Sequence, residues 1–570
     1  MFEYEKYPNP QFCREQTKLL DGEWDFAILD GFFDTGVLTD GFTGRINVPY
    51  CPESLLSGVG YTGPIHYCKY RKLFHVRQGD RRVILHFGAV DYHACIYINN
   101  RFVAEHIGGY TPFSVDITDA VEEGENSVVV LVYDNVLDDS ASGKQSDKDE
   151  SYGCYYTRTT GIWQSVWLEY VPQQFVQSVR FYPSVDNCSV DIELTVEGKG
   201  QIETKVLYDG VAVGQNRSEI EHFLRITVPL SQKHLWEIGQ GNLYDVEIAF
   251  NGDCVHTYFG LREVRTEGNR FLINGKSVFQ MLVLDQGFYR EGIYTAPNER
   301  EMKERIRMAQ RIGFHGARLH QKAFEPKFLY YCDKSGYIVW GEYPSWGLRC
   351  FDIKNIGYAI NEWTEEIQRD FNHPSIIAWC PLNEAWNDGY MNRGFVRECS
   401  IEYVRLMYSV TKVCDSTRPC VGSSGGFHCD ETDLYDFHDY GGYDRFAQVF
   451  DDFEQHGQLL REPNLVPKNS LPNYRGQPLF VSEYGGQSVS SNGWGYNTDH
   501  LTAQQWVDNI CRITGLIKSK PYIAGACYTQ LYDVEQEQNG LYTYDDEPKF
   551  DVAQARQLKQ AFTQKAQIED

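Results

Sequence analysis

The sequence predicts a protein of three domains: an N-terminal β jelly roll, a middle immunoglobulin-like β-sandwich and a C-terminal (β/α)8 TIM barrel. The chain has 570 residues, which is too long for one hydrophobic core. Its first half consists of short alternating runs separated by turn residues, a pattern typical of β-strands. After residue 265 the pattern changes to buried strands that alternate with helices. We therefore expect domains at residues 1–171, 172–265 and 266–570.

Composition narrows the class of protein and its partners. Hydrophobic residues make up 42% and aromatic residues 14% of the chain, which indicates a folded protein with a large core. The net charge of −26 predicts no nucleic acid and no anionic membrane as partners. The N-terminus lacks the apolar stretch of a signal peptide, and no run is long enough to span a membrane. The 16 cysteines show no CxxC pair, so we expect buried free thiols and a cytoplasmic protein.

The first two domains are predicted from runs of alternating apolar residues. In the first domain the clearest runs are Arg82–Phe87, Ala94–Asn99 and Ser127–Tyr133, with Gly, Asn and Asp turns between them. This density of strands, with little helical periodicity, predicts a jelly roll. In the second domain the runs are VDIELTVEG, ETKVLYDG, FLRITVPL and YDVEIAF. The Cys-Trp-Cys pattern of antibody domains is missing, so the spacing of strands alone predicts the sandwich.

The third domain has eight predicted strands joined by helices or long connections, as a (β/α)8 barrel requires. Asn298 is expected to cap the first helix, with Glu301 as its capping-box partner, and Gly313 to end it. An open doubly wound sheet is the alternative, but no Gly-rich phosphate loop follows the first strand. The predicted strands are Phe279–Asp285, Ala317–His320, Tyr337–Glu342, Ile376–Glu384, Pro419–Ser424, Tyr435–Tyr440, Pro478–Gly485 and Ile523–Leu531.

Polar residues at the carboxyl ends of these strands point to catalysis, because a packed barrel end needs no such group of carboxylates. Strands four and seven lie roughly opposite each other, so Glu384 and Glu483 are expected to face each other. Glycoside hydrolysis needs a carboxylic acid and a carboxylate on opposite sides of the sugar, about 5–5.5 Å apart in retaining enzymes. The charge of the carboxylate would raise the pKa of the acid. The polar residues are Asp285, Arg318, His320, Glu342, Asn383, Glu384, His438, Asp439, Tyr440 and Glu483.

Two motifs, PLNEAW (Pro381–Trp386) and VSEYGG (Val481–Gly486), resemble the acid/base and nucleophile signatures of glycoside hydrolase family 2. This family includes β-galactosidases, β-glucuronidases and β-mannosidases. The resemblance covers nearly the whole chain, including TGIWQSVWLE in the jelly roll and YTQLYDVEQEQNGLYTYD near the last barrel strand. It implies a retaining exo-β-glycosidase without a cofactor, with Glu384 as acid/base and Glu483 as nucleophile. The expected partner is a small carbohydrate or glycoconjugate.

The resemblance also implies a set of sugar-binding residues. Asn383 would bond the 2-hydroxyl, Tyr440 would hold the nucleophile, and Arg158 would line the site from the jelly roll. Core packing is the alternative for Tyr440, and an ion pair between domains is the alternative for Arg158. The other expected sugar-contacting residues are Asp285, His320, Gln321, Arg349, Trp386, His438 and Tyr528.

Departures from the family pattern leave the substrate open. Gln321 replaces a histidine, Tyr528 aligns with the tryptophan that floors the sugar site, and Tyr155 replaces an aspartate. The Asn-x-Lys motif that holds a uronate carboxylate in typical glucuronidases is missing from Glu537–Gly540. A uronate would then need another cation, and the candidates are Arg349 and Lys322, each of which would otherwise be a surface charge. A neutral β-galactoside remains open. Pro344 replaces a histidine beside Glu342 in the magnesium site of large β-galactosidases, so no metal is expected.

Three other functions are alternatives to a retaining glycosidase. The first is a non-catalytic carbohydrate-binding protein on a glycosidase scaffold, although both glutamates are present. The second is an inverting hydrolase, which needs its carboxylates about 6.5–9.5 Å apart. The third is a metal-dependent barrel hydrolase, which no HExxH or other tight ligand cluster supports. The sugar epimer, the group at C6, the aglycone and the formation of a homo-oligomer stay open.

Overall fold

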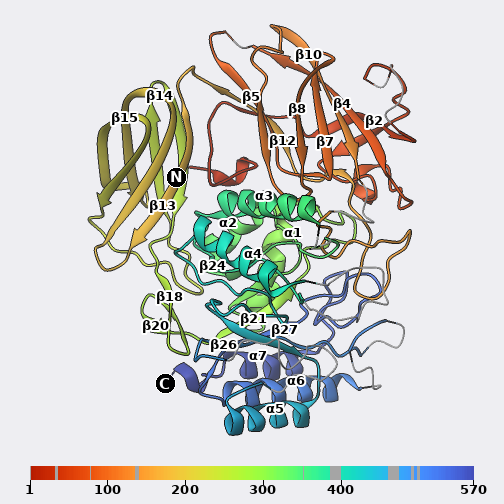
Figure 1. Ribbon diagram of the computed structural model, residues 1–570, viewed down its shortest axis with the longest axis vertical. Coiled ribbons are helices and arrows are strands. Elements are labelled where there is room, and N and C mark those ends of the chain that lie inside the picture. The colour runs from red at the N-terminus through yellow and green to blue at the C-terminus, as the bar shows by residue number, and fades with distance from the viewer. Residues whose placement is uncertain are drawn as a thin grey trace.

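The computed structural model describes residues 2–31, 36, 38–77, 79–134, 140–348, 350, 352–385, 399–459, 474–489, 493–496 and 501–569. The chain forms two β domains that lie side by side above a larger α/β domain (Figure 1). The jelly roll is red to orange, the middle domain is yellow, and the barrel with its helices runs from green to blue.

The jelly roll is built from two antiparallel sheets that pack around a core including Trp24, Tyr70 and Phe87. The predicted strand Arg82–Phe87 is β5, with alternate residues buried as its pattern predicts. The two other predicted strands are also present, with ends shifted by one to three residues. The sheets are β1(Thr17–Leu19)-β12(Val166–Val171)-β5-β9(Phe113–Asp116) and β3(Gly44–Val48)-β2(Gly22–Leu29)-β4(Tyr67–Val76)-β10(Gly124–Tyr133)-β7(His93–Ile98)-β8(Arg101–Ile107), with β6(Val90–Asp91) paired to β11(Gly161–Ile162).

The middle domain is one five-stranded antiparallel sheet that closes around its own apolar core. Two of the predicted strands, VDIELTVEG and ETKVLYDG, are a single strand of 20 residues, so that part of the prediction was wrong. Gly198 and Gly200 resemble a turn in the sequence, but they only shift the register between Thr195 and Lys199. One half of this strand pairs with β13 and the other half with β16. The strands are β13(Val176–Ser184), β14(Ser189–Tyr208), β15(Val211–Pro229), β16(Tyr244–Phe250) and β17(Asp253–Phe259).

The barrel contains a curled parallel sheet of seven strands in the described residues, not eight. The fifth predicted strand, Pro419–Ser424, makes single parallel bridges from Cys420 to Trp379 and from Ser424 to Asn383. Gly422 and the two glycines after Ser424, Gly425 and Gly426, interrupt a regular β-ladder in this segment. The order is β24(Ile376–Cys380)-β23(Ile338–Glu342)-β22(Gly316–Leu319)-β21(Gln280–Asp285)-β27(Ile523–Thr529)-β26(Leu479–Gly485)-β25(Tyr435–Asp439), and a small sheet of β18(Val264–Glu267), β19(Arg270–Ile273) and β20(Lys276–Ser277) precedes it.

Helices cover the outside of the barrel. In the first of them Asn298 accepts a hydrogen bond from the Glu301 N–H, as a helix cap does, and the helix ends at Arg311 shortly before Gly313. Its buried residues include Met302, Ile306 and Ala309, the stripe that the sequence predicts. The helices are α1(Glu299–Arg311), α2(Pro326–Ser335), α3(Ile353–Asp370), α4(Ile401–Cys414), α5(Tyr443–His456), α6(Ala503–Lys518) and α7(Val552–Thr563), with short 3-10 turns at Tyr4–Lys6, Leu55–Ser57 and Gln567–Glu569.

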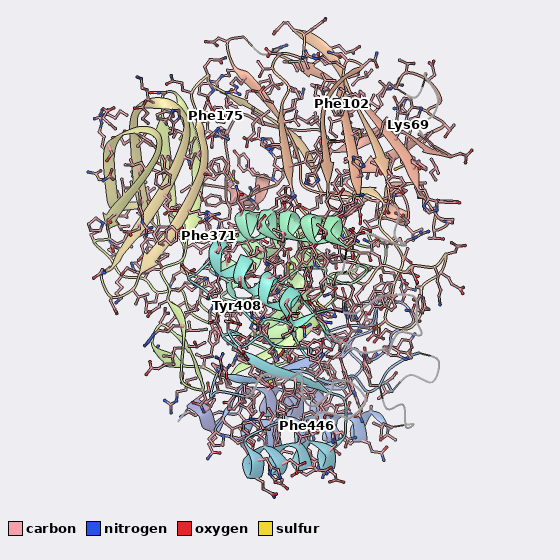
Figure 2. The ribbon with its side chains drawn as sticks, viewed as in Figure 1. Lys69, Phe102, Phe175, Phe371, Tyr408 and Phe446 are labelled. Carbon is pink, nitrogen blue, oxygen red and sulfur yellow. The ribbon has the colours of Figure 1, made fainter. Side chains whose placement is uncertain are left out.

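Both β domains dock on the barrel through specific contacts. The Tyr110 N–H of the jelly roll donates to Glu362 on α3 at 3.0 Å. Phe371, labelled in Figure 2 where the middle domain meets the barrel, lies edge-on to Tyr182 with 5.3 Å between ring centroids. Asn372 accepts from Phe181 N–H at 3.0 Å beside it. The barrel is therefore tied to each β domain by polar contacts as well as by apolar packing.

The remaining composition-based expectations concern thiols and membranes. All 16 cysteines are free, and ten of them are buried, most of these in the apolar core that includes the barrel. No helix within the described ranges combines the length and the apolar character that crossing a bilayer would require.

Three of the buried carboxyl groups of the jelly roll have raised pKa values and give this domain an unusual dependence on pH. Burial raises the pKa of Glu53 to about 7 and that of Asp134 to about 7, and it raises the pKa of Asp91 well above its usual value. Glu53 accepts a hydrogen bond from the Thr160 N–H at 3.2 Å. The folded state therefore holds protons at pH values where the unfolded chain has released them.

We expect Glu53→Gln to reduce the loss of stability that accompanies rising pH. Because the folded pKa of Glu53 is raised, its contribution is fully present below the unfolded pKa, near 4.3, and is lost as pH rises through about 7. Urea unfolding at pH 5 and pH 8 should show a fall in unfolding free energy that is up to about 3 kcal/mol smaller in the variant. Exposed Glu15→Gln is the control, and identical pH dependence of Glu53→Gln and wild type would contradict the assignment.

Candidate active site

Two glutamates and a histidine meet at the carboxyl ends of the barrel strands. A carboxylate oxygen of Glu384, one of Glu483 and a ring nitrogen of His438 all lie within 4.8 Å of one another. Glu483 belongs to β26 and His438 to β25, whereas Glu384 follows the end of β24 by four residues. The structure thus brings together the pair that the barrel topology predicts.

Glu483 is buried and held as a carboxylate by its neighbours. Arg318 donates to one oxygen at 2.9 Å, and the Tyr440 hydroxyl donates to the other. Burial alone would raise the pKa of Glu483, but His438 and Arg318 lower it below the usual value. Glu483 is therefore ionised at neutral pH, as a nucleophile must be.

Arg318 on β22 is the fully buried cation around which the site is arranged. Its Nε donates to Glu342 at 2.6 Å, and its other nitrogens donate to Glu483, to the Ser482 carbonyl at 3.2 Å and to Asn383 Oδ1. Burial would lower the pKa of Arg318, but Glu342 and Glu483 raise it well above its usual value. A planar guanidinium with five donors can join three strands in this way, which a lysine cannot.

Asn383 is oriented by Arg318. A guanidinium only donates hydrogen bonds, so the side-chain oxygen of Asn383 must face it. The amide nitrogen then has no protein partner within the described residues and remains available to a hydroxyl acceptor. Trp346 fixes the backbone at this point, because its indole N–H donates to the Asn383 carbonyl at 3.0 Å.

Glu384 sits in a strained backbone conformation that other contacts hold in place. Its φ is +49°, a left-handed value that is uncommon for residues other than glycine. Its N–H donates to the Ser424 carbonyl at 2.8 Å, and its carboxylate lies 2.9 Å from His438 Nδ1. The other ring nitrogen of His438 lies 3.1 Å from Ser424 Oγ, which donates to Asp436 at 2.7 Å. His438 therefore spans the two catalytic candidates with a fixed ring.

Gln321 and His320 support Glu342 beside this group. His320 Nδ1 lies 2.9 Å from Glu342, and burial lowers the pKa of His320, so that the ring is neutral. The Gln321 amide donates to Glu342 at 3.2 Å and accepts from the Trp346 N–H at 2.9 Å. Gln321, at the position of the family's histidine, thus anchors the loop that follows β23.

Three other expected sugar-binding residues have contacts away from the glutamate pair. Asp285 accepts from Tyr532 and from the Gly287 N–H at 3.0 Å. The Tyr528 ring packs edge-on against Tyr484, whose hydroxyl meets Thr514 of α6. Arg158 is buried near Asp134, and its Nη2 has no protein partner in the described part of the chain. Trp386 and Arg349 lie outside the described residues.

Lys322, a candidate for holding a uronate, is neither a surface charge nor free. Its ammonium is buried and donates to the Gly287 carbonyl at 2.8 Å and to the Tyr294 carbonyl at 2.7 Å, with Glu325 at 3.5 Å. These acceptors use its three donors, so Lys322 holds loops together. The expectation that it is a surface charge was wrong.

The structure adds three residues that the sequence did not single out. Lys144 is 6% exposed, and its ammonium lies 3.9 Å from the centroid of a Trp346 ring. Tyr496 stacks on Tyr440 with 3.6 Å between centroids. Buried Glu537 accepts from Tyr156 and from Asn539 at 2.9 Å. One signal for Lys144 was available: the small residues before it, ending in Gly143, allow a loop to approach the barrel closely.

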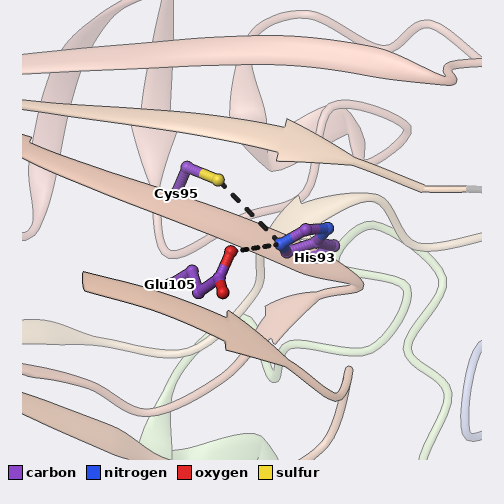
Figure 3. Close-up of side chains that lie close together, drawn as sticks. All are labelled: His93, Cys95 and Glu105. Atoms are coloured by element: carbon purple, nitrogen blue, oxygen red, sulfur yellow. Dashed lines mark hydrogen bonds and ion pairs between the residues drawn. The ribbon is translucent and has the colours of Figure 1, made fainter. Parts of the chain in front are cut away.

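Two groups of described residues have the spacing of metal ligands. In the first, the catalytic group itself, Arg318 already occupies the space beside Glu483, where a second cation would be repelled. The second is His93, Cys95 and Glu105 on the neighbouring strands β7 and β8 (Figure 3). Burial raises the pKa of the Cys95 thiol, so it holds its proton at neutral pH and is a poor ligand.

Comparison with known proteins supplies an independent finding. Residues 61–172 match the model of the glycosyl hydrolases family 2 sugar binding domain, and residues 264–564 match that family's TIM barrel domain. A β-galactosidase of Thermoanaerobacter pseudethanolicus is 27% identical over 500 residues, which are 81% of this chain and 60% of that protein. A β-glucuronidase of Paenibacillus borealis is 23% identical over 534 residues, 84% of each chain. The chain thus spans less than two thirds of the first relative's length.

Solved structures share the fold at low sequence identity. A Bifidobacterium dentium β-glucuronidase, complexed with coumarin-3-O-glucuronide, superposes with a TM-score of 0.79 at 20% identity over 98% of each chain. An Eisenbergiella tayi β-galacturonidase bound to galacturonate superposes with a TM-score of 0.74 at 18% identity, over 97% of this chain and 98% of that one.

Replacing Arg318 should destabilise the barrel in a pH-dependent way. Arg318→Met leaves the buried carboxylates of Glu342 and Glu483 without their cation, which costs about 3–5 kcal/mol of unfolding free energy at pH 7. Both carboxyls have lowered pKa values, so their paired stabilisation is present above the unfolded pKa and is lost as pH falls. Urea unfolding should show a smaller loss at pH 4.

Arg318→Lys is the matched variant, because it keeps the charge and loses only the forked geometry. Its destabilisation should be smaller than that of Arg318→Met at pH 7. An equal loss of unfolding free energy at pH 4 and pH 7 in Arg318→Met would contradict the role of the ion pairs.

Proposed function

The chain belongs to glycosyl hydrolases family 2, and on that premise we propose that it is a retaining exo-β-glycosidase. It releases a terminal β-linked hexose or hexuronic acid from a small carbohydrate or glycoconjugate. The observation that carries the proposal is the placement of Glu384 and Glu483, with carboxylate oxygens within 4.8 Å and Glu483 held in its ionised form. This spacing supports the retaining mechanism, since inverting enzymes keep their carboxyls about 6.5–9.5 Å apart.

In the first step the Glu483 carboxylate attacks the anomeric carbon, and the bond to the leaving oxygen breaks. Glu384 donates its proton to that oxygen, so the aglycone leaves as a neutral alcohol. Two carboxyls this close disfavour a doubly charged state, and Arg318 and Tyr440 keep the negative charge on Glu483. The proton of the pair therefore resides on Glu384, where the acid is needed.

In the second step Glu384 takes a proton from water, and the water oxygen replaces Glu483 at the anomeric carbon. The sugar leaves with its original β configuration, and Glu384 has its proton back. His438, 2.9 Å from Glu384, holds this carboxyl in place through both steps. The Asn383 amide nitrogen donates to the sugar 2-hydroxyl, an interaction that strengthens in the transition state.

Exo action is supported by the jelly roll, which narrows the open end of the barrel. The Ser142 N–H donates to the Trp346 carbonyl at 2.8 Å, so the loop of the first domain rests on the loop after β23. Trp386, Arg349, Arg158, Asp285, His320, Gln321, His438 and Tyr528 remain proposed contributors to the sugar site. A cytoplasmic location is supported by the 16 free cysteines, and the net charge of −26 disfavours nucleic acid and membranes as partners.

The alternative is a carbohydrate-binding protein that has lost catalysis. A protein under no demand for catalysis has no use for a buried, ionised Glu483 that accepts hydrogen bonds from Arg318 and Tyr440 and lies 3.5 Å from a ring nitrogen of His438. We therefore favour the enzyme.

Substitution of each glutamate should give a different pattern of rates. Glu483→Ala should lose nearly all turnover on every β-glycoside. Glu384→Ala should fall about 10²–10⁴-fold on alkyl glycosides and much less on dinitrophenyl glycosides, whose leaving group needs no proton. Circular dichroism checks the fold, and exposed Glu105→Ala is the control. Wild-type rates in both variants would remove the site assignment.

The stereochemistry of the product tests the mechanism directly. Proton NMR of the first-formed sugar should show the β anomer, since two displacements retain configuration. First-formed α anomer would require an inverting mechanism, and binding of sugars without hydrolysis of any β-glycoside would favour the non-catalytic alternative.

A further inference from the structure

A loop of the jelly roll carries a lysine to the mouth of the barrel. Residues 140–146 are all buried, and the N–H groups of Ser142 and Gly143 donate to the Trp346 carbonyl at 2.8 and 3.1 Å. Gly143, with φ +55°, passes so close to the Gln321 carbonyl that a Cβ at this position would collide with it. The next residue, Lys144, is thereby fixed over the face of Trp346, at 3.9 Å from the ring centroid.

Lys144 is a buried cation without a counter-ion. Among the described residues no carboxylate lies within ion-pair distance of its ammonium, and no acceptor takes a hydrogen bond from it. Burial would lower the pKa of Lys144, but Cys154, Glu537, Glu483 and Glu384 raise it, so the ammonium stays charged. Trp346, on whose face the ammonium lies, donates its indole N–H to the carbonyl of Asn383, the residue before Glu384, so the ammonium lies beside the catalytic loop. A charged ammonium with unused donors is costly to bury.

The other buried lysines show that this chain normally supplies acceptors. Lys518 donates to the Phe562 and Gln564 carbonyls at 2.6 and 2.7 Å, and Lys322 donates to two carbonyls. Lys69 donates to the Asp40 carbonyl. Lys144 is the exception in the described part of the chain, and it is also the buried lysine that the catalytic glutamates influence.

Glu537 does not fill this role. One of its oxygens accepts from Tyr156 and the other from Asn539 at 2.9 Å. Burial raises the pKa of Glu537, and Lys144, which lies beyond ion-pair distance of it, offsets part of that rise. Within the described residues the ammonium of Lys144 therefore keeps unused donors, and a carboxylate is the acceptor that also balances its charge.

We propose that Lys144 binds the carboxylate of the substrate, so that the enzyme is specific for β-hexuronides. This inference rests on the proposed function, because it assigns the substrate class of that same site. The stretch Glu537–Gly540 contains no lysine, and Lys322 is occupied, so a lysine from a different domain takes their place. A neutral hexoside would leave the ammonium unpaired in the bound state, and a uronate pairs it.

The test compares p-nitrophenyl β-glucuronide and β-galacturonide with β-galactoside and β-glucoside. Wild type should prefer a uronide by at least about 100-fold in kcat/KM. Lys144→Met should lose about 100-fold on the uronide and less than about threefold on neutral glycosides, mainly through KM. Lys144→Arg should restore part of the uronide activity. Lys148→Met, which removes an exposed lysine four residues after Lys144, is the matched control and should leave the preference unchanged.

Other outcomes would overturn the proposal. An equal loss on uronides and neutral glycosides would mean that Lys144 acts only on the catalytic glutamates. A wild-type preference for neutral glycosides would contradict the hexuronide specificity but not the proposed glycosidase activity. A lack of activity on every glycoside would contradict the proposed function itself. If Lys144→Met does not fold, competitive inhibition of wild type decides: free glucuronate or galacturonate should inhibit at least about tenfold better than galactose, and equal inhibition refutes the proposal.

Discussion

The fully buried guanidinium of Arg318 is the constraint on which the barrel mouth depends. It joins Glu342 of β23, Asn383 after β24 and Glu483 of β26, so three parts of the sheet are fixed relative to one another by one side chain. The same contacts set the protonation state of Glu483, which they keep ionised. They also set the orientation of Asn383, because they turn its amide nitrogen toward the open site. Arg318 thus sets both the positions of these side chains and the protonation state of Glu483, so a change at Arg318 would alter both.

Buried charge is handled in two ways in this molecule. In the barrel, Glu342 and Glu483 are paired with cations, and their pKa values fall. In the jelly roll, burial outweighs the opposing influences on Glu53 and Asp134, including that of Arg158 on Asp134, and both pKa values rise toward neutrality. The difference follows from whether a partner compensates the loss of water. The two pairs of carboxyls therefore respond to acid in opposite senses.

Much of the fold and the catalytic pair could be predicted from sequence, because both leave local signals. The spacing of hydrophobic residues predicts the strands, and the sequence places Glu384 and Glu483 at the carboxyl ends of two of them. The role expected for Tyr528 was harder to judge, since all seven residues of β27 are buried and no alternation shows which side faces inward. Lys144 left almost no signal, because it reaches the site only when two domains pack together. Gly198 and Gly200 resembled a turn, although β14 continues through them.

Under the proposed function, the loop of residues 140–146 supplies a group that recognises the sugar, whereas the barrel supplies the groups that break the bond. These two sets of residues lie far apart in the sequence. The glutamates belong to the barrel, but the cation beside them is encoded more than 200 residues earlier, in a domain with its own core. Changes in that loop could alter which sugars enter without disturbing the groups that break the bond. Gly143 packs against the Gln321 carbonyl and so holds this loop of the jelly roll in a fixed position on the barrel. A lineage could thus exchange substrates by remodelling one buried loop between two domains while its catalytic machinery stayed untouched.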